Sequence, residues 1–143
     1  MINVPTRAPN TWRHAALTQP QLEFIEGLLR KARERALEFL AHFEESTQES
    51  GRGGTGELAR YASHPADEGT DTMRHELEST IATDTSDRFT KIEEALELLY
   101  NQPARFGTCH ECGSAIGFPR LELVPWTDVC ELCAAEAKSI TKR

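Results

Sequence analysis

The sequence has no long apolar run and few of the residues that build a large core. Only 38% of its 143 residues are hydrophobic and 7% are aromatic, whereas 27% are charged. No stretch approaches the length of a membrane-spanning helix, so we expect a soluble protein with no membrane partner. The chain has few apolar residues from which to build one globular core, and this composition favours an elongated shape.

The chain also lacks a secretory signal. Its first residues, MINVPTRAPNTWRHAAL, are rich in proline and contain no continuous apolar segment. We therefore expect a cytoplasmic protein with reduced thiols, because disulfides persist mainly in oxidising compartments. Residues 1–17 are predicted to form a flexible N-terminal arm.

Cysteine occurs only four times, and all four residues lie in one stretch near the C-terminus. Cys109 and Cys112 form one CxxC pair, Cys130 and Cys133 form a second, and seventeen residues separate the pairs. This spacing is typical of a four-thiolate zinc site, because each tight knuckle directs two sulfurs at one tetrahedral ion. Disulfide pairing and thioredoxin-like redox chemistry are the alternatives, and the second requires a βαβ context that the flanking sequence lacks.

A zinc ion held by four thiolates has no open coordination position, so we expect one structural Zn²⁺ per chain and no catalysis by it. His110 lies inside the first pair and imidazole also binds zinc, but four cysteines already satisfy the ion. We expect a short helix after Cys133. The loop between the pairs carries apolar residues that we expect to form short strands: Ile116, Phe118, Leu121 and Leu123.

Two amphipathic segments precede this module. The first is predicted over Thr18 to Glu49, because Thr18 and Gln21 fit a capping box and apolar residues recur at helical spacing. Residues 51–56, GRGGTG, interrupt it with four glycines. The second is predicted from about Asp71 to Asn101, with a loosened turn at residues 83–88, where its apolar stripe lapses. One stripe is expected to include Met73, Leu77, Ile81, Phe89, Ile92, Leu96 and Leu99.

Two such helices bury the most apolar surface when they fold back on each other, because each then covers the apolar stripe of the other. The predicted fold is therefore mainly α. It consists of an antiparallel coiled-coil hairpin over residues 18–103 with a tip loop near 50–70, and a zinc-finger domain with a C-terminal helix over residues 104–143.

Negative charge is concentrated in one part of the chain. Residues 53–102 hold eleven acidic and four basic side chains, whereas residues 1–52 hold seven of each and residues 103–143 five of each. No basic patch is present for phosphate contacts, so we predict no direct sequence-specific DNA binding. The acidic segment favours a positively charged groove or a site with metal ions.

Residues 64–71, HPADEGTD, lie in this acidic segment. Pro65 and Gly69 are typical turn residues, and Asp67 is suited to cap a following helix. The alternative is that these residues bind a partner. No serine, cysteine or histidine here has an evident catalytic partner group, so no enzyme activity is predicted.

The run FGTCHECGSAIGFPRLELVPWTDVCELC, residues 106–133, resembles the zinc finger of the DksA/TraR family of bacterial transcription regulators. The shared features are FG before the first cysteine, CxxCG, RLE and the closing CxxC. HPADEGTD, followed by an acidic helix, resembles the tip of that family's coiled coil. The resemblance implies a protein that binds RNA polymerase and inserts its coiled coil through the secondary channel, toward the catalytic magnesium.

By position, Asp67 matches the second aspartate of the family's tip motif. His64 stands where the best-known members have another aspartate and Gly69 where they have alanine, although a branch of the family has an HPAD-type tip. With Asp71, these residues are the candidate polymerase contacts. The resemblance makes the alarmone ppGpp a further candidate ligand, and we expect a monomer.

Two other functions stay open at this point. One is a zinc-stabilised coiled-coil adaptor that binds another protein or self-associates. The other is a zinc ribbon that binds nucleic acid, which predicts an affinity for DNA that falls steeply with salt.

Overall fold

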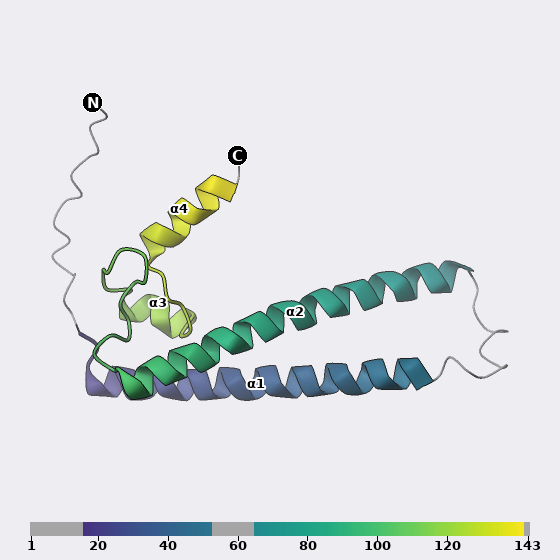
Figure 1. Ribbon diagram of the computed structural model, residues 1–143, viewed down its shortest axis with the longest axis horizontal. Helices are drawn as coiled ribbons and strands as arrows, with labels where there is room; N and C mark the ends of the chain where they lie inside the picture. Colours follow the sequence, from purple (N-terminus) through teal and green to yellow (C-terminus); the bar gives the residue numbers. More distant parts are fainter. Residues whose placement is uncertain (1–15, 53–64, 142–143) are drawn as a thin grey trace, which may run out of the picture. The chain divides into compact units, whose positions relative to one another are not determined.

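The structure is a computed structural model that describes residues 16–52 and 65–141, with side chains for residues 16–49 and 69–141. The helices of this described part are α1 (Gln19–Arg52), α2 (Pro65–Asn101), α3 (Phe118–Leu123) and α4 (Glu131–Thr141) (Figure 1). Its β pairing is limited to an isolated antiparallel bridge between Thr108 and Ala115. The prediction of a mainly α fold, with a long antiparallel hairpin, a small finger and a short C-terminal helix, is confirmed.

The chain divides into two compact units. One comprises Met1–Leu29 and Glu94–Arg143, and the other comprises Arg30–Glu93. Each unit therefore contains one part of α1 and one part of α2. Along the described ranges, no helix combines the length and the apolar character of a membrane span.

The start of α1 contains one of the two side-chain bonds of the predicted capping box. The backbone N–H of Thr18 donates to Oε1 of Gln21 at 3.0 Å, and the N–H of Leu22 donates to the carbonyl of Thr18 at 3.0 Å. The helix ends at Arg52, three residues beyond the predicted end. Gly51 therefore does not stop it, and the other glycines of GRGGTG lie outside the described residues.

The unit that holds the finger has a small apolar core. Ile25 and Leu29 of α1 and Leu121 of α3 are fully buried. The rings of Phe24 and Phe118 lie 6.0 Å apart at 53°, which brings α1 against α3. The other buried apolar members of this core include Leu96, Leu99, Phe106 and Ile116. The finger thus packs on the first turns of α1 and the last turns of α2.

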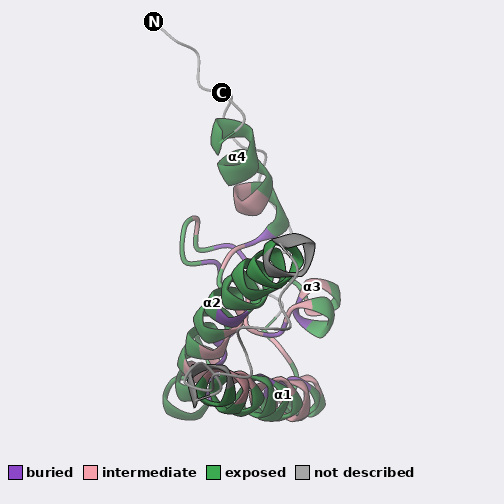
Figure 2. Ribbon diagram, turned by 90° about the vertical axis from the view of Figure 1, so that its right-hand side faces the viewer, coloured by how far each residue is buried: buried purple, intermediate pink, exposed green. Residues whose placement is uncertain are grey.

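The other unit is a pair of antiparallel helix segments. The Arg33 guanidinium of α1 pairs with the Glu93 carboxylate of α2 and lies 5.8 Å from the centroid of the Phe89 ring. Ile92 and Ala82 of α2 are buried in this pair. From residue 81 back to residue 69, every residue of α2 is exposed, as the colouring of its outer turns shows (Figure 2). The two helices diverge toward the end of α1 and the start of α2 (Figure 1).

The start of α2 differs from the prediction. The helix begins at Pro65 instead of about Asp71, so Pro65 and Gly69 lie in helical turns rather than in a loop. Proline suits the first helical position, because the N–H that it lacks would have no partner within the helix.

The middle of α2 also differs from the prediction, because the helix is continuous through residues 83–88. The hydroxyls of Thr83, Thr85 and Thr90 each donate to the carbonyl four residues earlier, at 2.7 to 3.2 Å. These threonine hydroxyls therefore find hydrogen-bond acceptors within the helix, and the helix is not interrupted. The expected loosened turn is wrong.

The expected single stripe along α2 is wrong as well. Ile92, Leu96 and Leu99 are buried, but Met73, Leu77 and Ile81 are exposed. The expected strands of the finger are also absent from the described residues, since Phe118–Leu123 form α3. Pro119 occupies the first turn of α3, where the missing N–H costs nothing.

Two glycines of the finger unit give opposite predictions for stability. A Cβ at Gly27, inside α1, would meet no atom within 4 Å. Alanine is favoured over glycine in a helix by about 1 kcal/mol, so Gly27→Ala should raise the free energy of unfolding by up to that amount. A Cβ at Gly107 would lie 3.0 Å from Cδ1 of Leu17, and the φ of Gly107 is +81°.

Gly107→Ala should therefore lower the free energy of unfolding by about 1–3 kcal/mol, through backbone strain and the close contact. Chemical denaturation followed by circular dichroism measures both variants against the parent. Effects of the same sign at the two positions would contradict the packing described here.

Candidate metal centre

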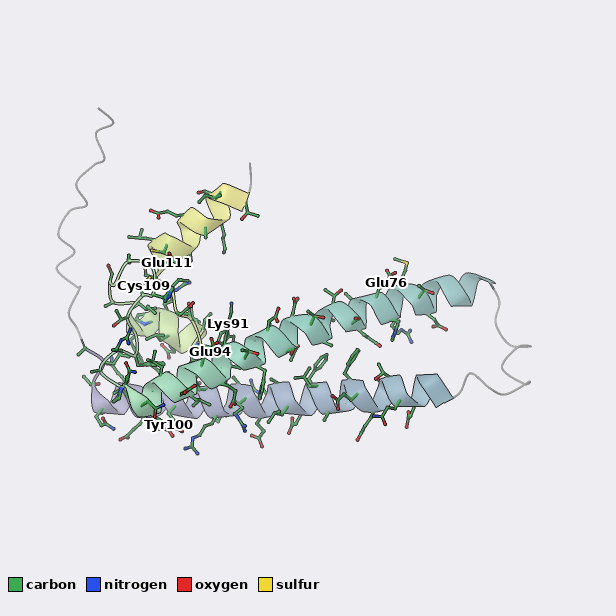
Figure 3. All side chains as sticks on the ribbon, in the orientation of Figure 1. Glu76, Lys91, Glu94, Tyr100, Cys109 and Glu111 are labelled. Carbon is green, nitrogen blue, oxygen red and sulfur yellow. The ribbon has the colours of Figure 1, made fainter. Side chains whose placement is uncertain are left out.

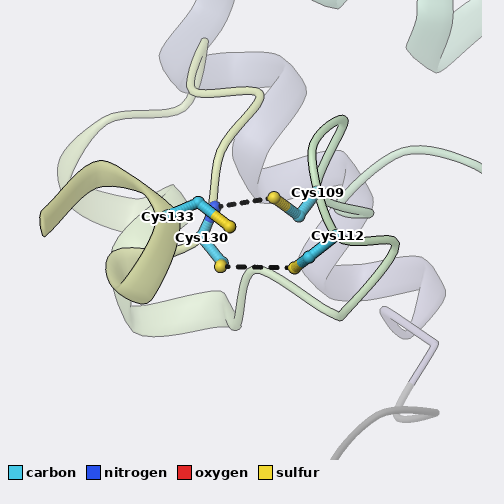
Figure 4. A group of neighbouring side chains, drawn as sticks. All are labelled: Cys109, Cys112, Cys130 and Cys133. Carbon is cyan, nitrogen blue, oxygen red and sulfur yellow. Dashed lines mark hydrogen bonds between the residues drawn. The ribbon is translucent and has the colours of Figure 1, made fainter. Parts of the chain in front are cut away.

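The four cysteines converge on one point although they come from two separate knuckles (Figure 4). Their sulfur atoms all lie within 4.8 Å of one another, and those of Cys112 and Cys130 lie 3.6 Å apart. Zn–S bonds of about 2.3 Å in a tetrahedron place the sulfurs about 3.8 Å apart, so the cluster has the size that zinc needs. All four thiols are free, which argues against the disulfide alternative.

The first knuckle is shaped by its backbone. Gly107 and Gly113 have φ of +81° and +69°, a region that glycine adopts readily. The N–H of Cys109 donates to the carbonyl of Ser114 at 2.8 Å, and the N–H of Gly113 donates to the carbonyl of Cys109 at 2.9 Å. These bonds close the tight turn that directs both sulfurs of the knuckle to one side.

The second knuckle is continuous with a helix and bonded to the first knuckle. Cys133 lies in the first turn of α4, which holds its side chain in a fixed direction. The N–H of Cys130 donates to Sγ of Cys109 at 3.2 Å. The N–H of His110 donates to the carbonyl of Asp128 at 2.8 Å, which joins the two loops a second time.

The thiols differ in their affinity for protons. Hydrogen bonds from the Ser114 side chain and backbone lower the pKa of the Cys112 thiol to about 6. Hydrogen bonding with Cys130, followed by burial, raises the pKa of the Cys133 thiol to about 12. At neutral pH the Cys112 thiol therefore loses its proton more readily than the Cys133 thiol does. Zinc binding is coupled to release of the remaining protons, since the ion takes thiolates.

The first knuckle contains a functional residue that sequence reasoning missed. Ser114 is the one buried polar residue of the described core, and it donates to the sulfur of a predicted zinc ligand. Partners of this kind orient a metal ligand and tune its charge. The available signal was a small hydroxyl residue two positions after the second cysteine, where the turn of the knuckle brings it back to the sulfur.

His110 is not part of the cluster. Its side chain is exposed, and Nδ1 lies 3.6 Å from Oε1 of Glu111. The four cysteines therefore form a site for one zinc ion without it, and the prediction of a closed, structural zinc site is confirmed.

The predicted tip residues lie partly outside the described residues. His64 lies outside the described residues, and the structure gives only the backbone place of Asp67, in the first turn of α2. Gly69 and Asp71 follow in the same helix and are exposed. Their role as contacts stays a prediction.

A closed four-thiolate finger that packs on the ends of two antiparallel helices defines a zinc-finger protein with a helical-hairpin arm. Residues 104–138 match the family model of the prokaryotic dksA/traR C4-type zinc finger. The chain belongs to the DksA/TraR family.

Two comparisons extend this likeness beyond the finger. An uncharacterized protein of Aquifex aeolicus (strain VF5) is 30% identical over 116 residues, which cover 81% of this chain and 77% of that protein. The structure of transcription factor DksA2 from Pseudomonas aeruginosa matches with a TM-score of 0.64 at 21% identity, over 87% of this chain and 88% of that one. At that identity, the second match shows a shared fold.

Removing one zinc ligand should lower both the zinc content and the thermal stability of the protein. We expect Cys130→Ser to bind less than one zinc per chain and to lower Tm by roughly 10 °C or more, because zinc supplies much of the folding free energy of so small a core. Ser139→Ala, at an exposed serine of α4, is the control and should leave both unchanged. Full zinc content and an unchanged Tm in the cysteine variant would contradict a four-thiolate structural site.

The Ser114 hydroxyl should slow the loss of zinc. Without its hydrogen bond, the Cys112 sulfur carries more negative charge and reacts more readily with protons and competing metal-binding groups. Ser114→Ala should therefore transfer zinc to a chromophoric chelator at pH 7 roughly tenfold faster. Stopped-flow or manual-mixing absorbance measures the rate. An unchanged rate in a variant with parental Tm would show that the backbone N–H bond alone protects the sulfur.

Proposed function

We propose that this protein is a non-enzymatic transcription regulator that binds bacterial RNA polymerase. In this proposal, the tip of the α1–α2 arm enters the secondary channel and modulates initiation, while the zinc finger supports the base of the arm. The observation that carries the proposal is the family's finger joined to an acidic helical arm in one chain.

The charge of α2 supports an arm that enters a positively charged channel. Residues 53–102 carry eleven acidic and four basic side chains, and most of the described carboxylates are exposed. A basic groove that leads to bound Mg²⁺ would attract this surface, whereas DNA would repel it. The exposed carboxylates of α2 are Asp71, Glu76, Glu78, Asp84, Asp87, Glu94 and Glu97.

The position of Asp67 supports its assignment as the main tip contact. It lies in the first turn of α2, close in sequence to residues 53–64, which connect α1 and α2. A carboxylate there also interacts favourably with the helix dipole, so a structural role must be separated from a binding role. Asparagine suits this purpose, since it favours helix N-termini but carries no charge.

The remaining parts of the proposal follow from the same family assignment. The protein acts as a cytoplasmic monomer, without direct sequence-specific DNA binding. His64, Gly69 and Asp71 are the further tip contacts, and ppGpp is a candidate co-ligand. Adding ppGpp to the binding and transcription assays described next tests the last point.

Retention on immobilised core RNA polymerase and output from a reconstituted promoter test the proposal together. We expect the zinc-loaded parent to be retained and to change promoter output. Asp67→Asn should be retained but lose most of the effect on output, because it lacks the charge that acts near the catalytic magnesium. Asp87→Asn, on the same helix, is the matched control and should behave like the parent.

No retention of the parent would sink the proposal and favour the adaptor function. A variant Asp67→Asn that binds and alters output as the parent does would refute the tip assignment alone.

A further inference from the structure

The outer half of α2 carries an apolar stripe that α1 does not cover. Met73, Leu77 and Ile81 follow one another at four-residue intervals, and they are 72%, 60% and 41% exposed. Three large apolar side chains in one row on a helix are normally covered by another element. Within the described part of this unit, α1 is the only other element, and it leaves them open.

The phase of the helix explains why α1 leaves this stripe open. Ala82 is the last buried residue of α2 before the loop. Met73 lies nine residues before it, which is about two and a half turns and places it on the opposite side of the helix. Leu77 lies five residues before Ala82, which is also well away from the buried side. The exposed stripe and the buried stripe therefore occupy different faces.

The residues that would continue the buried stripe toward the loop are polar. Stepping back from Ala82 by three or four residues gives Glu78, His75 and Asp71, all of which are exposed. The side of α2 turned to α1 therefore offers no apolar contact there, which fits the divergence of the helices in Figure 1. Closure of the hairpin would not bury Met73 or Leu77, so no described part of this chain is placed to cover them.

Charge around the stripe identifies the kind of partner. Glu76 lies next to the stripe, on the side of α2 turned away from α1 (Figure 3). Asp84 lies three residues after Ile81, at the inner end of the stripe, and Arg74 flanks Leu77 on the other edge. Over residues 69–84, the exposed charged side chains are four carboxylates and one guanidinium, so the surface around the stripe is negative overall: Asp71, Glu76, Glu78, Asp84 and Arg74. A second copy of the chain would place two negative surfaces against each other, and like-charge contacts cost binding energy. A surface with apolar side chains at its centre and lysine or arginine at its rim is complementary.

The stripe also continues the proposed tip. Gly69 precedes Met73 by four residues, so it lies on the same face, and no atom lies within 4 Å of its Cβ position. One partner surface could therefore contact the tip glycine and the three apolar residues in a continuous row.

We infer that Met73, Leu77 and Ile81 form a docking stripe, by which the arm binds an apolar protein surface with a basic rim. The inference rests on the proposed function, because it assigns that surface to the wall of the polymerase channel that receives the arm. The tip then acts near the catalytic centre of the polymerase, and the stripe contributes affinity by binding the channel wall.

A direct titration tests the stripe. The zinc-loaded full chain, labelled with a fluorophore in the N-terminal arm, is titrated with purified core RNA polymerase, and anisotropy gives Kd. We expect Met73→Gln/Leu77→Gln to raise Kd at least tenfold. Glutamine is a good helix former and both positions are exposed, so circular dichroism and Tm should stay as in the parent. The matched control, Leu37→Gln on α1, replaces a residue that is 41% exposed and should leave Kd within twofold.

The outcomes separate the stripe from the proposed function. If the parent binds and the double variant binds equally well, the docking stripe is overturned and polymerase binding stands. If the parent does not bind, both the proposed function and the partner assigned to the stripe are refuted. Sedimentation of the same proteins tests the other occupant: a dimer of the parent that the double variant abolishes would assign the stripe to a second copy and overturn the inference.

Discussion

The convergence of four thiolates on one zinc ion is the interaction on which the finger unit depends. Its apolar core is small, with Ile25, Leu29 and Leu121 as its fully buried large side chains apart from Cys109. Metal binding adds the free energy that such a core lacks, and it fixes two loops that come from distant points in the sequence. Because the ends of α1 and α2 pack in this same unit, the zinc site also holds the base of the helical arm.

The arm has two different kinds of surface on one helix. Near the finger, α2 turns Ile92, Leu96 and Leu99 inward, whereas near the loop it turns Met73 and Leu77 outward. The inner part therefore buries its apolar side chains, whereas the outer part leaves apolar and acidic side chains exposed. This division fits the proposed regulator, whose arm enters another protein. The outer half of such an arm needs a surface that its own partner helix does not cover.

Much of the site could be predicted from the sequence, because ligand spacing is local and zinc geometry restricts it strongly. The capping box at Thr18 was equally accessible, since it involves neighbouring residues only. The side of α2 on which Met73, Leu77 and Ile81 lie could not be predicted. Their spacing is helical by itself, and their direction relative to the buried residues depends on whether the helix is continuous through residues 83–88. Ser114 was missed for a related reason: its bond to Cys112 depends on the backbone path of the knuckle, not on residue type. The short α3 replaced expected strands because few local signals distinguish the two in a stretch of alternating apolar residues.

Hydrogen exchange of the zinc-loaded full chain, with and without core RNA polymerase, tests the central claim most directly. Polymerase should slow exchange in residues 65–81, the part of α2 that carries the proposed tip contacts and the proposed docking stripe. Slower exchange confined to residues 104–138, with no change in residues 65–81, would show that the finger is the binding surface and would contradict the account.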